Sequence, residues 1–481
     1  MSSSGHIPPD SAAPELEHSS DEMRNPVTSK GKRSWLIVFA ALAASGALYA
    51  FLPQVFPAAD DMARKGLALL FFVAILWLTE AIHVTFTALI VPVAAVLLGF
   101  PDMTMSKSLT TFADPIIFLF FGGFALATAL HVQKLDRKIA FWILSLTGAH
   151  LGMASVMLFV ATAVLSMWIS NTATAAMLLP LALGILGHMD TQKERNTIAF
   201  VLLGIAYSAS IGGLGTPVGS PPNGIVVKAL GMSFTDWIKV GLPLMLLLMP
   251  LMVLSLWLVF RPQLNRRIEL PKEDIPWTRE RVLSLVVFAM TALAWILGDQ
   301  VKNVLGIATP DTWIAITAAI VIGMLRLASW RQISDNTDWG VLFLFGGGIT
   351  LSNIMRSSGA SAVLGDMVAG FLSGASPFVV ILGVAAFIVL LTEFTSNTAS
   401  AALLVPVFAA IAERMGMPPT VLVLVIGIGA SCAFMLPVAT PPNAIVYATG
   451  KVFQRDMIRA GAVLNTVAIA LLAIWAHLFW R

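Results

Sequence analysis

The sequence predicts an all-helical, polytopic membrane protein that contains an inverted-topology repeat. The first observation is composition: hydrophobic residues make up 58% of the chain and charged residues only 11%, against about 25% charged in a typical soluble domain. The second is that apolar runs recur along the chain at about the 20 residues that a helix needs to cross a membrane. The third is a polar motif that occurs twice within apolar sequence, each time ahead of a proline-broken turn.

The N-terminal segment, residues 1–33, is polar and rich in Ser, Pro and acidic residues, so we predict a disordered cytoplasmic tail. We do not expect a cleavable signal peptide here, because no cationic region leads directly into a short apolar stretch that ends in small residues. The apolar runs predict eleven transmembrane helices, at 34–52, 64–82, 84–100, 115–133, 195–213, 236–260, 281–300, 311–327, 338–356, 418–436 and 457–480. Two further stretches, 151–187 and 376–412, are each long enough for two half-helices, and we predict that both are re-entrant hairpins.

The basic residues predict the orientation. They cluster at Lys30, Lys32 and Arg33; at Lys134, Arg137 and Lys138; at Lys193 and Arg195; at Arg261, Arg266 and Arg267; at Arg326 and Arg331; and at Lys451, Arg455 and Arg459. With a cytoplasmic N-terminus and hairpins that return to their own side, all these clusters fall in the cytoplasm, as the positive-inside rule requires. We therefore predict a multi-pass protein of the cell (inner) membrane whose C-terminus lies outside.

This orientation places the hairpin at 151–187 on the inner side and the hairpin at 376–412 on the outer side. A polar linker, residues 261–280, connects the first half of the membrane region, 34–260, to the second half, 281–481. We expect the linker to lie in the cytoplasm.

Two polar tripeptides with the sequence Ser-Asn-Thr lie inside the predicted hairpins, 226 residues apart. They are Ser170-Asn171-Thr172 and Ser396-Asn397-Thr398. Each precedes a Pro-Pro-Asn turn, which begins at Pro221 in the first copy and at Pro441, 220 residues later, in the second. A Phe-Leu-Phe motif with glycines precedes each hairpin, at Phe118 and Phe343. An odd number of crossings separates the copies, so they face opposite ways and the hairpins meet near the middle of the membrane.

The chemistry of these motifs suits a small anion together with a cation. A helix that is broken at membrane depth leaves backbone N–H and C=O groups without partners. The N-terminus of each second half-helix favours an anion, and the carbonyl groups that end each first half-helix favour a cation. Neither hairpin core nor either turn contains Lys or Arg, so a co-bound cation has to neutralise the anion. The motifs also lack the carboxylate that a proton carrier would use, which favours Na⁺ over H⁺.

At these motifs the chain closely resembles the divalent anion:sodium symporter family, in particular its bacterial dicarboxylate members of the INDY type. The matching segments are SMWISNTATAAMLLP, YSASIGGLGTPVGSPPN, TDWGVLFLFGGG, LTEFTSNTASAALL and SCAFMLPVATPPNAIV. The resemblance runs from about Leu36 to the C-terminus. It implies eleven transmembrane helices plus two re-entrant hairpins in a scaffold and a transport domain, a homodimer, and sodium-coupled import of C4-dicarboxylates (succinate, fumarate, malate) by an elevator-type alternating-access mechanism.

The resemblance also implies site residues by position. Two sodium sites would be formed by Ser166, Ser170, Asn171 and the backbone near Gly219, and by Thr392, Ser396, Asn397 and the backbone at Ala439. The substrate carboxylates would meet Ser170, Asn171, Thr172, Ser396, Asn397 and Thr398, with Thr440, Pro441 and Val446 lining the pocket. Ser166 and Thr392 each lie four residues before the serine of their tripeptide, one helical turn away, so each can face the same ion as the tripeptide.

Some alternatives stay open at this point. The chain could instead be an anion exchanger for di- or tricarboxylates, such as citrate or tartrate against succinate. An integral membrane enzyme is disfavoured, because HExxH, GxSxG and paired His/Asp sets are absent, and a formal charge of +3 is too small to suggest nucleic acid as a partner. Glu80 and Glu393, at or near membrane depth, either take part in function or fix helix ends through hydrogen bonds.

Overall fold

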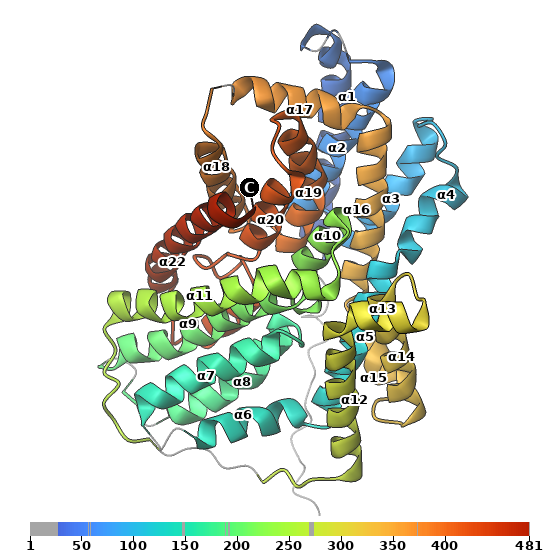
Figure 1. The fold of residues 1–481 in the computed structure, drawn as a ribbon. Coiled ribbons are helices and arrows are strands. Elements are labelled where there is room, and N and C mark those ends of the chain that lie inside the picture. Colours follow the sequence, from blue (N-terminus) through green and yellow to red (C-terminus); the bar gives the residue numbers. More distant parts are fainter. Residues whose placement is uncertain are drawn as a thin grey trace, which may run out of the picture.

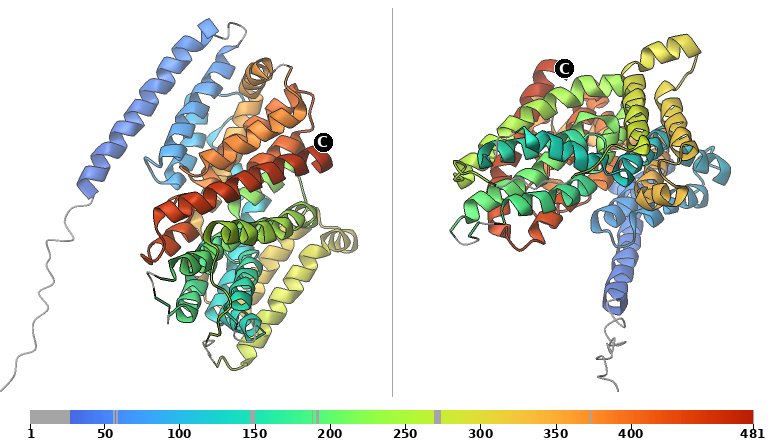
Figure 2. Two further views of the ribbon diagram at one scale, coloured as in Figure 1. Left: turned by 90° about the vertical axis from the view of Figure 1, so that its left-hand side faces the viewer. Right: turned by 90° about the horizontal axis from the view of Figure 1, so that it is seen from below.

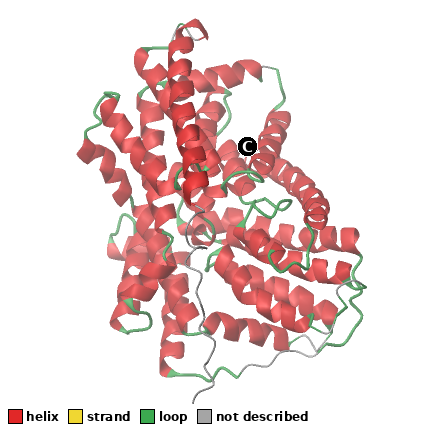
Figure 3. Cartoon of the chain, turned by 180° about the vertical axis from the view of Figure 1, so that it is seen from behind, coloured by secondary structure: helices red, strands yellow, loops and turns green. Residues whose placement is uncertain are grey.

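The computed structural model describes residues 27–480, except 56, 58, 147–149, 188, 191–192, 269–273 and 373. Helices joined by loops make up this part of the chain (Figure 3), with one isolated β-bridge between His150 and Arg267. The first helix begins at Val27, within the segment predicted as a tail, and residues 1–26 of that tail lie outside the described residues.

The helices fall into two series separated by the segment 261–278. The first series is α1 (Val27–Val55), α2 (Asp61–Thr79), α3 (Val84–Leu97), α4 (Met105–Leu109), the 3₁₀ turn η1 (Thr110–Ala113), α5 (Pro115–Val132), α6 (Leu135–Ser145), α7 (Leu151–Ser166), α8 (Asn171–Ile185), α9 (Arg195–Gly212), the 3₁₀ turns η2 (Gly213–Gly215) and η3 (Pro217–Gly219), α10 (Pro221–Leu230) and α11 (Phe234–Phe260). The second is α12 (Arg279–Ile296), α13 (Gly298–Leu305), α14 (Pro310–Met324), α15 (Trp330–Asn336), α16 (Trp339–Ser357), α17 (Ala360–Phe371), α18 (Pro377–Leu391), α19 (Asn397–Arg414), α20 (Pro419–Ala430), α21 (Pro441–Tyr447), α22 (Gln454–Trp475) and the π-helical turn η4 (Ala476–Trp480).

Six helical segments among the described residues are long and apolar enough to cross a membrane: Ser34–Gln54, Asp61–Thr79, Met105–Val132, Arg195–Gly215, Phe234–Phe260 and Gln454–Trp480. A seventh results if α12 and α13 count as one span. The chain is therefore a helical multi-pass membrane protein, as predicted. The predicted count of eleven spans is higher than this. Among the other predicted spans, α3, α14 and α20 have only 14, 15 and 12 residues, and α16, with 19 residues, is not among the six.

The span predicted at 281–300 is not one straight helix. α12 ends at Ile296, and α13 leaves it at an angle of 81°. Leu297 between them departs from helical geometry, with φ −95° and ψ 25°. Nothing in the apolar pattern of this segment marks the bend, because hydrophobic periodicity reports which face is buried and not the direction of the axis.

Four helical paths are broken within apolar sequence. α7 and α8 are separated by 167–170, and α18 and α19 by 392–396, so each stretch predicted as a hairpin consists of two helices. Ser170 and Ser396 act as N-caps of the helices that follow, which is a preferred role of serine. The breaks after α9 and α20 end at Pro221 and Pro441, where proline suits the first position of the next helix.

The two series interlock. The first series supplies α5, which packs against α14 of the second, and α3, which packs against α16. A Cβ atom on Gly122 would lie 2.5 Å from the Ala315 carbonyl oxygen, and one on Gly347 would lie 2.7 Å from Ala88 Cα, so glycine permits both close approaches. Helices α10 and α21 also contact the opposite series: α10 packs on α19 and α20, and α21 packs on α8 and α9.

Helices α9 and α20 form the centre of the molecule. Every residue of α9 from Thr197 to Gly212 is buried, and so is every residue of α20 from Val421 to Ala430. α9 lies beside α7 and α11, and α20 beside α18 and α19. Figure 1 and the views of Figure 2 show α6 and α17 at opposite ends of the molecule, with the broken helices between them. Both breaks after the central helices therefore begin inside the protein.

Candidate functional site

The first hairpin turns around three oxygen atoms from three helices. Ser166 Oγ, at the end of α7, lies 2.7 Å from Asn171 Oδ1 at the start of α8 and 2.7 Å from the Ala209 carbonyl oxygen on α9. Ser170 Oγ accepts a hydrogen bond of 3.3 Å from Ala173 N and so caps α8. The hydroxyl group one turn before the tripeptide therefore faces the tripeptide asparagine, with α9 as the third partner.

The second hairpin repeats this arrangement. Thr392 Oγ1 lies 2.5 Å from Asn397 Oδ1 and 2.9 Å from the Ala430 carbonyl oxygen on α20. Ser396 Oγ accepts a hydrogen bond of 3.4 Å from Ala399 N, as Ser170 does in the first hairpin. The same three kinds of oxygen, from a hydroxyl group, an amide and a main-chain carbonyl, are thus grouped twice.

Each group contains more acceptors than hydrogens. A Ser or Thr hydroxyl group has one hydrogen, and here it lies within hydrogen-bond distance of two acceptor oxygens that have none. Hard cations such as Na⁺ are bound by oxygen ligands of these three types. The arrangement can therefore take a cation in exchange for a hydroxyl–oxygen hydrogen bond.

Two glycines bring further carbonyl oxygens to the first group. A Cβ atom on Gly213 would lie 2.6 Å from Asn171 Oδ1 and 3.1 Å from the Gly219 carbonyl oxygen. A Cβ atom on Gly219 would lie 2.6 Å from the Gly213 carbonyl oxygen and 2.9 Å from that of Met167. The backbone at Gly219, which the resemblance assigned to a sodium site, therefore lies against the first tripeptide.

The start of each second half-helix presents free backbone donors. Within the described chain, the N–H groups of Asn171, Thr172, Asn397 and Thr398 form no backbone hydrogen bond, as expected for the first turn of a helix. Ser170 and Thr172 are exposed, and Ser396, Asn397 and Thr398 are partly exposed. These groups can donate to the oxygens of an anion.

The residues predicted to line the substrate pocket belong to the second turn. Thr440 is buried, and its Oγ1 accepts a hydrogen bond of 3.3 Å from Asn443 N. Pro441 is exposed at the start of α21, which packs on α8 behind the first tripeptide. Val446 is fully buried on the same short helix. The turn of the second copy therefore lies beside the hairpin of the first.

A cavity of about 720 Å³ opens beside the first tripeptide, between α5, α6 and α8. It begins at Ala173, two residues after Asn171, and follows α8 to Pro180, with His131 and Arg137 on the facing helices. Arg137, Ala140 and Phe141 of α6 form the wall that faces α8, and Figure 1 shows these two helices close together.

Comparison with known proteins identifies the family. The model of the sodium:sulfate symporter transmembrane region matches residues 32–481. The chain therefore belongs to this family. An uncharacterized transporter of Haemophilus influenzae is 54% identical over 429 residues, which cover 88% of this chain and 93% of the relative. A sodium-dependent dicarboxylate transporter of Staphylococcus saprophyticus is 31% identical, with 86% of each chain covered.

A solved structure supports the fold alone. The YdaH transporter of Alcanivorax borkumensis matches with a TM-score of 0.56 and 16% identity, over 78% of this chain and 87% of that one. The resemblance to a sodium-coupled anion transporter family that the motifs indicated is confirmed. As a member of the sodium:sulfate symporter family the chain is a transporter and not an enzyme.

The sequence left open whether Glu393 takes part in function or fixes a helix end, and the structure shows its hydrogen-bond partners. This buried carboxylate accepts hydrogen bonds from the backbone N–H groups of Phe434, Met435 and Leu436, at 2.7 to 3.0 Å, and from Asn465 Nδ2 at 2.7 Å. It therefore fixes the irregular segment after α20, directly beside Thr392. Glu80 is exposed at the end of α2, and within the described part of the chain it forms no such arrangement.

Sequence reasoning missed the role of the two turn asparagines in this symporter fold. Asn223 Nδ2 donates to the carbonyl oxygens of Gly213 and Thr216, at 2.7 and 2.8 Å. Asn443 Nδ2 donates to those of Ala433 and Leu436, at 3.3 and 3.0 Å. These donors close both breaks in the same way, so the asparagine of each Pro-Pro-Asn turn holds the unwound chain that precedes it. The presence of this asparagine in both copies was the sequence signal that could have indicated the role.

Proposed function

We propose that the protein is a sodium-coupled secondary active transporter that imports C4-dicarboxylates such as succinate, fumarate and malate. The sodium:sulfate symporter family supplies the transporter class and the coupling ion. The name of the Staphylococcus saprophyticus relative supports a dicarboxylate as the substrate. The oxygen groups of the site suit a sodium ion, and the helix N-termini beside them suit a dicarboxylate.

The observation that carries the proposal is the doubled oxygen group. Ser166, Asn171 and Ala209 in one copy, and Thr392, Asn397 and Ala430 in the other, each offer three uncharged oxygen ligands. Two cations bound there would supply positive charge next to the tripeptides, where the sequence has no Lys or Arg. The sodium ions would then neutralise a dianion bound by the helix N-termini. Bound sodium would raise the affinity for the dianion, and the bound dianion would raise the affinity for sodium.

The proposed transport cycle uses alternating access of this shared pocket. We infer eleven membrane crossings and two hairpins, with the N-terminus in the cytoplasm and the C-terminus outside the inner membrane. A transport domain that contains the hairpins would move against a scaffold domain in an elevator-type mechanism, within a homodimer. The large cavity beside Ala173, which would open toward the cytoplasm in this orientation, supports a substrate path on that side.

Uptake into proteoliposomes tests the function. The purified protein is reconstituted without internal anion, and uptake of radiolabelled succinate is measured under separate gradients of Na⁺, K⁺ and H⁺. We expect uptake only with an inward Na⁺ gradient, competed by fumarate and malate. Uptake that needs a preloaded internal anion would identify an exchanger instead. Uptake of sulfate but of no dicarboxylate would overturn the substrate class and leave the site intact.

A further inference from the structure

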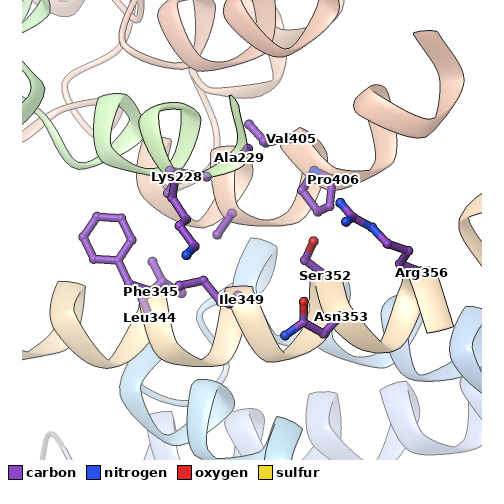
Figure 4. A pocket seen from close by; sticks show the side chains of 13 residues that line it. Lys228, Ala229, Leu344, Phe345, Ile349, Ser352, Asn353, Arg356, Val405 and Pro406 are labelled. Carbon is purple, nitrogen blue, oxygen red and sulfur yellow. The ribbon is translucent and has the colours of Figure 1, made fainter. Parts of the chain in front are cut away.

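A second cavity, of about 220 Å³, lies between α10, α16 and α19 (Figure 4). Its walls are mostly apolar, with Phe345 on α16 and Val405 on α19. Four polar side chains also line it: Lys228, Ser352, Asn353 and Arg356. None of these four belongs to the tripeptides or to the Pro-Pro-Asn turns.

The polar lining is rich in donors. Among the described residues, the side chains of Ser352, Asn353 and Arg356 form no hydrogen bond and no ion pair, and the cavity wall contains no acidic residue. Lysine and arginine side chains are donors only, and arginine offers a planar fork that matches a carboxylate. The lining therefore suits an anion that carries several acceptor oxygens.

Lys228 already holds one carboxylate. Its Nζ lies 2.5 Å from Asp114 Oδ2, at the N-cap of α5. In Figure 4, Lys228 on α10 and Arg356 on α16 extend toward the same space, with Ser352 and Asn353 below it on α16. The cavity is smaller than the roughly 300 to 1,000 Å³ of pockets for drug-sized ligands, which points to a small anion.

Two of the three walls of this cavity, α16 and α19, correspond to the α5 and α8 walls of the larger cavity beside the first tripeptide. Arg356 follows Phe343 by 13 residues, as His131 follows Phe118, and Pro406 follows Pro180 by 226 residues. His131 and Pro180 line the larger cavity, and Arg356 and Pro406 line this one. Each cavity therefore lies beside the helix that follows the tripeptide of its own copy.

The distance to the second tripeptide is short. The cavity begins on α19 at Ala402, five residues after Asn397, which is about 7 Å along a helix axis. An anion in this cavity would therefore be a short step from the N-terminus of α19.

We propose that the cavity lined by Lys228, Ser352, Asn353 and Arg356 binds a small dicarboxylate before it reaches the tripeptides. The choice of ligand rests on the proposed function. Arg356 binds one carboxylate through its two parallel N–H groups, and Lys228 exchanges Asp114 for the other. Ser352 and Asn353 donate to the remaining oxygens. The two cationic side chains also raise the local concentration of anions.

Cysteine labelling tests the site without transport. Ser352→Cys introduces a thiol in the cavity, and the native Cys432 is buried. The purified protein is treated with an anionic or a cationic methanethiosulfonate reagent at low ionic strength. We expect the anionic reagent to react faster, on the order of tenfold, and succinate to slow it. Arg356→Gln should remove both effects, whereas Arg331→Gln on the exposed face of α15 should leave them unchanged.

Two further arms distinguish anion binding in this cavity from binding at the tripeptides and from binding of a lipid. In an Asn171→Ala background, slowing by succinate should persist, and its loss there would show that the tripeptides caused it and overturn the proposal. In nanodiscs with phosphatidylglycerol, slowing by that lipid but not by succinate would assign the cavity to a lipid headgroup and also overturn it. If succinate protects the introduced thiol while proteoliposomes transport no dicarboxylate, the proposed function fails and the anion site stands.

Transport provides a second readout. Under the proposed function, Arg356→Gln should raise the KM for succinate several-fold from one side of the membrane and leave kcat nearly unchanged, because the side chain acts before the substrate reaches the tripeptides. An equal fall in kcat for transport from both sides of the membrane would overturn the proposal that Arg356 acts on the substrate path.

Discussion

The two copies of the repeat reach the same geometry with different residues. In the first copy, Thr216 Oγ1 donates to the Met167 carbonyl oxygen and accepts from Gly219 N at 3.1 Å. In the second, Leu436 stands at the position of Thr216. There the carboxylate of Glu393, at the position of Met167, binds three backbone N–H groups.

The same contrast extends to the close contacts of the backbone. Gly213 and Gly219 of the first copy correspond to Ala433 and Ala439 of the second. The first oxygen group is therefore tightly enclosed by backbone, whereas the second lies beside the buried carboxyl group of Glu393 and has room for two methyl groups. Under the proposed function, similar ligands in unlike surroundings predict two cation sites of unlike affinity.

The largest effect should come from the asparagines that the copies share. Asn171→Ala or Asn397→Ala removes the amide oxygen of one group, and we expect dicarboxylate uptake to fall on the order of a hundredfold, as a loss of about 3 kcal/mol would give. Uptake in proteoliposomes measures this. Asn336→Ala, on an exposed face of α15 where the amide binds only Gln332 O, should transport normally. Full uptake in either tripeptide variant would remove the site from consideration.

Glu393 should give the next largest effect, and only in the second copy. Glu393→Gln replaces one acceptor oxygen by an NH₂ group that faces backbone donors, so we expect a loss of unfolding free energy on the order of 3 kcal/mol. Thermal unfolding of the detergent-solubilised protein measures the change. Met167→Leu, at the corresponding position, preserves volume and should cost less than about 1.5 kcal/mol. Equal midpoints for both variants would contradict the contrast between the copies.

The enclosed backbone of the first copy predicts that substitution there, and not in the second copy, changes the sodium dependence of uptake. A Cβ atom on Gly219 would clash with the Gly213 and Met167 carbonyl oxygens, so Gly219→Ala should raise the Na⁺ concentration for half-maximal uptake about tenfold, a cost near 1.4 kcal/mol. Ala439→Gly only removes a methyl group and should shift that concentration little. A similar shift in both variants would mean that the glycine is not what sets the geometry of the first group.

The smallest effect should come from Thr216. Thr216→Val keeps the shape of the side chain but removes the hydrogen bonds to Met167 O and Gly219 N, which should cost about 1 kcal/mol of unfolding free energy. Thermal unfolding again provides the measurement, with Thr466→Val on α22 as the control, since its hydroxyl group binds only Ala462 O within its own helix. A loss no greater than that of the control would show that the first break does not depend on this hydroxyl group.

The sequence predicts best what depends on local pattern. Apolar runs and duplicated motifs locate both broken hairpins, and the spacing of Ser166 and Thr392 before the tripeptides predicts the face that they share. The bend at Leu297 and the number of membrane crossings depend on tertiary packing, which periodicity does not report. The first helix also begins at Val27, inside a segment that its polar composition marks as a tail.

The missed parts of the site are long-range contacts. Glu393 binds a backbone segment about 40 residues later in the chain, and Asn465 lies 72 residues away. The basic cavity combines Lys228 with Arg356, which are brought together only when α10 packs on α19 beside α16. No local rule of spacing predicts such encounters, although the repeat could have shown that Arg356 and His131 hold corresponding positions.

The packing of helices from one series against the other has a consequence for the folding of each half of the chain. Helix α5 packs against α14, and α3 packs against α16. The close backbone contacts at Gly122 and Gly347 therefore each join the two halves of the chain. Neither half is therefore expected to fold without the other. Chains cut within 261–280 should accordingly reassemble when produced together, and either fragment alone should be degraded.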